Sequence, residues 1–308
     1  MVVGERIPWL PVIRLHAVNL VVVLLIATTV ALAHRYLEFR PAISPLPFSV
    51  VGVALSIFLA FRNNASYDRY WEGRKLWGGI VNSSRSFGRQ VTSLLAAPAA
   101  DEPALAALRI RLVHRQIAWA HALRAALRGE VVDDELTALL SAPDLQTSKA
   151  VANQPVALMQ LQARELADAA ARGWLTDMRL VTLDHTMTDL TALQGGCERI
   201  KKTPIPLAYR FFTHTFVRVF CVFLPFALVD QLGLATVAAS LAVTFVFLVL
   251  DRIGAIIEDP FTTGINALPL VAICRTIEID LRTQLGETDL PAPITPIPIP
   301  GGVAKQLR

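Results

Sequence analysis

The sequence predicts an all-α membrane protein in which four transmembrane helices are combined with a large cytosolic helical region. Three observations lead to this fold class. The hydrophobic fraction of 54% and the mean hydropathy of +0.48 exceed what a soluble core requires, so part of the apolar surface must face lipid. Two long runs near the N-terminus carry no fixed charge, and the middle of the chain repeats leucine at helical spacing.

Four candidate spans remain between the charged residues of the chain. The first two contain no Asp, Glu, Lys or Arg, and each is close to the ~20 residues that a helix needs to cross ~30 Å of hydrocarbon. The third contains His214 and Arg218, whereas the fourth is free of charge. The spans are residues 15–33, 41–61, 211–229 and 231–250.

The connections between the spans predict their arrangement and orientation. Only Asp230 and its neighbours up to Gly233 separate the last two spans, so these should form an antiparallel hairpin. Arg35 and Arg40 lie in the first external loop, but more basic residues flank the region between the second and third spans, which places that region and both termini in the cytoplasm. These residues are Arg62, Arg69, Arg74, Lys75, Arg85, Arg89, Arg199, Lys201, Lys202 and Arg210.

The cytosolic region reads as helical. Leu105, Leu108 and Leu112 begin a leucine stripe within a predicted helix at 104–129, which Gly129 would end. The chain shows no strand pattern. Further helices are predicted at 154–171 and 175–194, and loops or insertions at 96–103 and 129–155.

The C-terminal tail from Pro291 has a different composition. It alternates Pro with apolar residues, which suits either a polyproline-like arm lying on a neighbour or disorder. The domain organisation is therefore 1–61 (N-terminal segment and first two spans), 62–210 (cytosolic helices), 211–250 (last two spans) and 251–308 (cytosolic C-terminal segment).

Several function classes find no support in the residues. The net charge of +4 is explained by basic residues beside the spans, and no basic stripe with interleaved aromatics indicates nucleic-acid binding. The three cysteines form no CxxC pair, and the six histidines form no HExxH motif. No nucleophile, metal cage or phosphate loop indicates an enzyme, and no cofactor is expected.

The second span carries two rows of residues at helical spacing. Gly52, Ser56 and Ala60 form a small-xxx-small row that allows close helix packing. Another face carries Leu46, Val50 and Ala54, which either pack against a neighbour or line a narrow pore. The span continues without Pro into a polar, charge-dense helix, RNNASYDRYWEGRKLW at residues 62–77.

This polar helix, together with ERIKKTPIP at 198–206 and IEDPF at 257–261, closely resembles the bestrophin family in its bacterial branch. The resemblance covers nearly the whole chain. It implies a homopentamer around a central pore that passes small monovalent ions passively across the inner membrane. The partners would be the ions, the lipid membrane and further copies of the chain.

The resemblance also assigns residues to two constrictions. The neck would be formed by Leu46, Val50 and Ala54, with Phe58 included if the register moves by one helical turn. The cytosolic aperture would be Val181, for which an ordinary core valine is the alternative. An apolar ring can block ions by dewetting.

The sequence gives less direct evidence on the charge sign of the ion and on regulation of the channel by calcium. Apolar rings choose no sign, and Asp184 and Asp189 near the expected exit favour cations over chloride. No acidic residue lies between Asp259 and Glu278, so we do not expect the calcium site of animal relatives. The alternative function is a non-conducting membrane scaffold or regulatory protein that docks a cytosolic partner, which the Pro-rich tail would suit.

Overall fold

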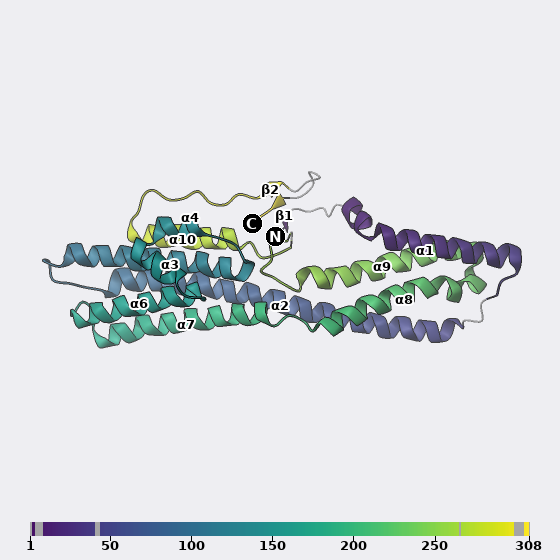
Figure 1. Cartoon of the computed structure of the whole chain (residues 1–308), viewed down its shortest axis with the longest axis horizontal. Helices are drawn as coiled ribbons and strands as arrows, with labels where there is room; N and C mark the ends of the chain where they lie inside the picture. The colour runs from purple at the N-terminus through teal and green to yellow at the C-terminus, as the bar shows by residue number, and fades with distance from the viewer. Residues whose placement is uncertain (1, 4–8, 41–43, 265, 299–304, 308) are drawn as a thin grey trace.

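The computed structural model describes residues 2–3, 9–40, 44–264, 266–298 and 305–307, and it is an elongated assembly of helices in two bundles (Figure 1). One bundle contains α1 (Trp9–Leu37), α8 (Leu207–Leu232), α9 (Thr236–Ile257) and the first half of α2 (Pro45–Leu94). The other contains the second half of α2 together with α3 (Glu102–Arg128), α4 (Asp133–Leu139), α5 (Ala142–Lys149), α6 (Gln154–Ala171), α7 (Asp177–Lys202) and α10 (Leu270–Leu285).

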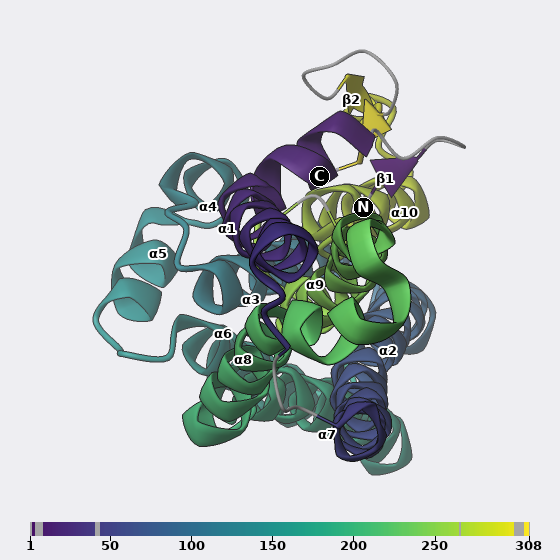
Figure 2. The same ribbon diagram turned by 90° about the vertical axis from the view of Figure 1, so that its right-hand side faces the viewer.

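The first bundle contains the segments that are long and apolar enough to cross a membrane. Within the described residues these are three, Ile13–Leu37, Pro45–Leu94 and Leu207–Ile257. The third is two helices rather than one, because the chain turns through the short 3-10 helix η1 (Gly233–Ala235) with Gly233 at a φ of 52°. The helices α8 and α9 then lie side by side, as the short connection predicts, and Figure 2 shows this bundle from its end.

Helix α2 joins the two bundles without interruption. Its 50 residues span about 75 Å at the rise of an α-helix. It begins among the apolar residues of the first bundle and ends in the core of the second (Figure 1). The helix that the sequence predicts to continue beyond the second span is therefore present, and it connects the two bundles.

The core of the second bundle is centred on α3. The leucine stripe that the sequence identifies is buried at Leu105, Leu108 and Leu112, and Trp119 is fully buried further along the helix. Arg115 is also only 1% exposed, and it is compensated by carboxylates of Asp144 at 2.7 Å and Glu165 at 3.1 Å. Because α3 is covered on nearly all sides, it is the central element of this bundle.

Two parts of the chain differ from the sequence-based expectations. The segment 129–155, expected to be a loop or insertion, contains α4 and α5, and Ser141 caps α5 by accepting a hydrogen bond from the Asp144 amide. No strand was expected, yet the two ends of the chain form a small antiparallel sheet in the order β1-β3-β2. Its strands are β1 (Val2–Val3), β2 (Ile297–Pro298) and β3 (Lys305–Gln306).

Two glycines set the close approach of α2 and α7. A Cβ added to Gly196 of α7 would lie 2.8 Å from Leu76 Cδ2, and one added to Gly79 of α2 would lie 2.8 Å from Leu193 Cδ2. Each helix therefore places a leucine on a glycine of the other. This reciprocal packing fixes the register between the two helices.

The adjacent glycines of α7 provide a test of this contact. We expect Gly195→Ala, where an added Cβ meets nothing within 4 Å, to raise the free energy of unfolding by about 0.5–1 kcal/mol through helix propensity. Gly196→Ala should bring no such gain, because Leu76 must move. Thermal unfolding of the purified protein in detergent measures both, and equal shifts would contradict the packing.

Candidate functional site

The predicted neck residues lie on an uncovered face of α2 within one subunit. Leu46 is 75% exposed and Val50 64% exposed, and Ala54 is exposed as well. Phe58 differs, because it is half-buried and its ring lies 4.6 Å from that of Tyr209 on α8. Of the four residues, three therefore present free apolar surface, and Phe58 is used in packing within the subunit.

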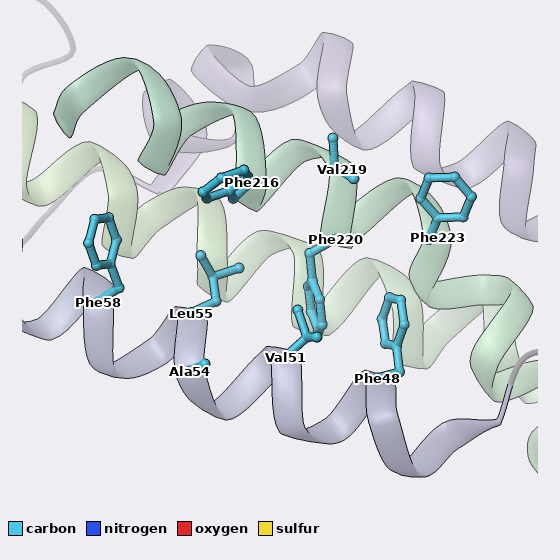
Figure 3. Close-up of a pocket in the computed structure, with 9 residues that line it drawn as sticks. All are labelled: Phe48, Val51, Ala54, Leu55, Phe58, Phe216, Val219, Phe220 and Phe223. Atoms are coloured by element: carbon cyan, nitrogen blue, oxygen red, sulfur yellow. The ribbon is translucent and has the colours of Figure 1, made fainter. Parts of the chain in front are cut away.

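The adjoining side of this stretch of α2 faces α8 across an apolar groove of about 420 Å³, and Ala54 and Phe58 also line this groove (Figure 3). Phe48 and Val51 of α2 and Phe216 and Phe223 of α8 are among the residues that line it. Gly52 packs close to Phe220, as an added Cβ would lie 3.1 Å from the ring. In the small-xxx-small row, Gly52 therefore packs against α8, whereas Ser56 and Ala60 are exposed.

Val181 lies on the exposed face of α7. It is 63% exposed, whereas Leu183, Met187 and Leu190 are buried in the core of the second bundle. Within the subunit Val181 is therefore not a core valine.

The two predicted vestibule carboxylates lie near this face of α7. Asp184 is exposed, and Asp189 lies 3.4 Å from Nδ1 of His185. The structure places the proposed neck and aperture in different bundles, so a single subunit does not bring them together.

The three sequence motifs meet where the two bundles join. Arg69 of α2 donates hydrogen bonds to three main-chain oxygens at the ends of other helices. Its acceptors are Ile200 O at 2.7 Å and Thr203 O at 2.6 Å, at the end of α7, and Glu258 O at 3.1 Å, at the end of α9. A cation is well placed here, because helix C-termini carry partial negative charge and unpaired carbonyls.

Side-chain ion pairs reinforce this junction. Lys201 of the ERIKK segment lies 2.7 Å from Asp259 of the IEDPF segment, and Arg199 pairs with Glu72 of α2. Asp259 also accepts a hydrogen bond from the Phe261 amide at 3.1 Å. Charged residues in the polar segment 62–77 of α2 therefore form contacts within the chain and are not all directed to solvent.

Glu198, the first residue of the ERIKK segment, is held in its ionised form. Burial would raise its pKa, but hydrogen bonds from Gln194 at 2.7 Å and Asn153 at 3.0 Å, with Lys202 nearby, outweigh burial and lower the pKa. These bonds connect α7 to the start of α6. Glu198 is thus a structural anchor of the motif.

A second ion pair lies on the membrane side of the junction. Arg62 is 1% exposed and donates to Asp251, whose other oxygen accepts from Nδ1 of His214 at 2.7 Å. Sequence reasoning did not identify Asp251 as the partner of Arg62. The signal was present, because Arg62 and Asp251 each follow directly after a charge-free span and so lie at the same depth.

The cysteines are inert in this arrangement. Cys197, Cys221 and Cys274 are free and buried, and burial raises the pKa of Cys197 and of Cys274 to about 12. Their thiols therefore stay protonated at neutral pH. Among the described residues no group of three or more His, Cys, Asp or Glu side chains converges as a metal site.

Arg69 can be tested separately from other basic residues. The variant Arg69→Lys retains the charge, but a lysine cannot reach all three carbonyl oxygens. We expect the free energy of unfolding to fall by about 3 kcal/mol, because two charged hydrogen bonds disappear. Arg74→Lys, on an exposed side chain of the same helix, is the matched control. Thermal unfolding in detergent compares them; equal stability of the two variants would show that the carbonyl contacts contribute little.

Comparison with known proteins agrees with this geometry. Residues 11–283 match the family model described as "Bacterial/Fungal Bestrophin protein". The protein is similar to the voltage-dependent anion channel-forming proteins YneE of Escherichia coli K12 (42% identical over 81% of this chain and 80% of the relative) and RSc3414 of Ralstonia nicotianae (39% over 83% and 82%). A crystal structure of a bacterial bestrophin homologue from Klebsiella pneumoniae superimposes with a TM-score of 0.81 at 32% identity, over 88% of this chain and 98% of that one. The chain therefore belongs to the bestrophin family.

Proposed function

We propose that the protein is the subunit of a homopentameric channel through which small monovalent ions cross the inner membrane passively. The observation that carries this proposal is the exposed apolar row of Leu46, Val50 and Ala54 on a helix that runs from the apolar bundle into the cytosolic one. An uncovered row on such a helix is what a ring of subunits would turn toward a central axis. Membership of the bestrophin family supports the same conclusion.

The proposed membrane arrangement has four crossings, made by α1, the first half of α2, α8 and α9. Four spans leave no room for a pore inside one subunit, so conduction requires a ring of copies. Pairing of β1 with β3 supports a common side for both termini, and the positive-inside rule assigns that side to the cytoplasm.

The neck would act through its hydrocarbon surface. A narrow ring of Leu46 and Val50 loses water easily, so that an ion entering it must give up hydration without receiving polar contacts in return. Ala54 is smaller than its two neighbours in the row and would leave its level of the neck wider. Val181, exposed on α7, would form the second constriction at the cytosolic exit.

For the sign of the ion we propose cations over chloride. Neither constriction discriminates, because both are apolar, so selectivity must come from charges beside the path. Asp184 is exposed less than one helical turn from Val181, and Asp189 follows further along α7. The names of the relatives state anion channels, which favours the opposite sign, and the flux experiment therefore measures both.

The scaffold alternative depends on a free C-terminal tail. Ile297–Pro298 pairs with Lys305–Gln306 of the same tail, and Arg275 of α10 donates to the carbonyl oxygen of Ala292 at 3.2 Å. These described parts of the tail are used within the chain, which favours the channel.

Substitution of the neck gives the first test. We expect Val50→Ser to raise cation flux into liposomes several-fold, because a hydroxyl keeps the constriction wet. Val246→Ser is the matched control: Val246 is 54% exposed, comparable with the 64% of Val50, but lies on α9 and not on the proposed row. Flux is measured under potassium and under chloride gradients.

The control variant distinguishes an effect on the proposed pore from an effect that any serine substitution on the surface of the membrane bundle would have. Equal increases for Val50→Ser and Val246→Ser would contradict the proposed row. A larger chloride than potassium flux in every variant would reverse the proposed sign. No flux from any correctly assembled oligomer would favour the scaffold.

Substitution of the aperture is an independent test. Val181→Ala removes two methyl groups from the proposed exit, and we expect altered flux without loss of assembly. Val156→Ala, on an exposed valine of α6 in the same bundle, should leave flux unchanged. If both variants behave like the wild type, Val181 does not line the path.

A further inference from the structure

A second cavity lies at the end of the membrane bundle that adjoins the cytosolic bundle. It has a volume of about 650 Å³ and is formed by the start of α1, the start of α8 and the end of α9, with Arg62 of α2 also lining it. Unlike the groove between α2 and α8, it is lined by charged and polar side chains. Neither the neck nor the aperture uses it.

The cavity has a strong excess of positive charge. Four arginines line it against a single carboxylate, that of Asp251, which is already bound by Arg62 and His214. The remaining arginines form no side-chain ion pair with any described residue; they are Arg210, Arg218 and Arg252. Cations at the edge of a bilayer are costly unless they find anionic partners or water.

Two buried polar groups also lack a partner among the described residues. His16 is 7% exposed and its Nε2 makes no hydrogen bond, and Arg62 is 1% exposed and its Nε makes none. Both residues line the cavity. Buried polar atoms of this kind are normally satisfied, and an anion with several acceptor oxygens would satisfy Arg62 Nε and, in the tautomer that carries its proton on Nε2, His16 as well.

The rim of the cavity identifies the source of the anion. Leu15, Leu207 and Phe211 are 55%, 70% and 61% exposed and lie among its lining residues. Large apolar side chains next to unpaired arginines match the boundary between acyl chains and headgroups. A free inorganic anion would make no use of this apolar rim.

We propose that this cavity binds the phosphate group of an anionic phospholipid of the cytosolic leaflet. The phosphate oxygens accept hydrogen bonds from the arginines, and the acyl chains lie along Leu15, Leu207 and Phe211. The bound lipid contacts α1, α8 and α9 together and so stabilises the membrane bundle. The inference rests on the proposed membrane orientation but not on ion conduction, so absence of flux would leave it intact.

Lipid binding to the delipidated oligomer in detergent tests the proposal. Native mass spectrometry is used to titrate phosphatidylglycerol and phosphatidylcholine with identical acyl chains, and a parallel thermal-unfolding series compares stabilisation by phosphatidylglycerol with stabilisation by inorganic phosphate. We expect retention of phosphatidylglycerol at about tenfold lower concentration than phosphatidylcholine, and no comparable stabilisation by inorganic phosphate.

Variants assign the binding to the cavity. Arg210→Gln/Arg252→Gln should weaken phosphatidylglycerol binding about tenfold, whereas Arg14→Gln/Arg74→Gln removes two exposed charges outside the cavity and should not. The double variant Arg210→Lys/Arg252→Lys keeps both positive charges. We expect it to retain part of the phosphatidylglycerol binding, which would show that substitution of these two residues leaves the fold intact.

Three results would overturn the proposal. These are equal affinity for the two lipids, equal weakening by the two glutamine double variants, and stabilisation by inorganic phosphate that matches that by phosphatidylglycerol. The last result would assign the cavity to a free anion rather than to lipid.

Discussion

The arrangement of the whole subunit depends on the three hydrogen bonds that Arg69 donates to the ends of α7 and α9. Arg69 lies near the middle of the one helix that runs through both bundles, and its acceptors end one helix of each bundle. The negative ends of two helices are thus held on a single cation. Since α7 carries Val181 and α2 carries Val50, this contact fixes the distance between the two proposed constrictions.

Close packing and charge extend this constraint in both directions. Within the second bundle, the reciprocal contacts of Leu76 with Gly196 and of Leu193 with Gly79 hold α2 and α7 in one register. Toward the membrane, Arg62 pairs with Asp251 almost out of contact with solvent. A buried pair of this kind stabilises only while both partners are present, because either one alone would be an uncompensated buried charge.

Features that depend on local composition were predictable from the sequence. The charge-free runs and the continuous α2 follow from local composition, because charged residues bound the spans and no Pro separates the second span from the polar helix. The residue pattern of the sequence did not reveal that Arg62 and Asp251 form an ion pair, because the two residues are 189 positions apart. The resemblance to bestrophins named the three motifs, but only the structure shows that Arg69 joins them.

Other differences between the sequence-based expectations and the structure also have physical causes. The helices α4 and α5 are short and polar, and each lacks the long apolar period on which helix prediction depends. The strand β1 pairs with β3 from the opposite end of the chain, which no local pattern encodes, and the pairing of β2 with β3 involves only two residues from each strand. The packing of Phe58 on Tyr209 likewise depends on the approach of α8 to α2, which a helical register alone does not give.

The central claim is that copies of this chain surround an axis on which the exposed row of α2 and Val181 of α7 converge. Single-particle imaging of the purified protein in lipid nanodiscs measures this directly. The account predicts five subunits, with the side chains of Val50 and Val181 facing the axis. A different number of subunits, or a ring in which Val50 faces lipid, would contradict it.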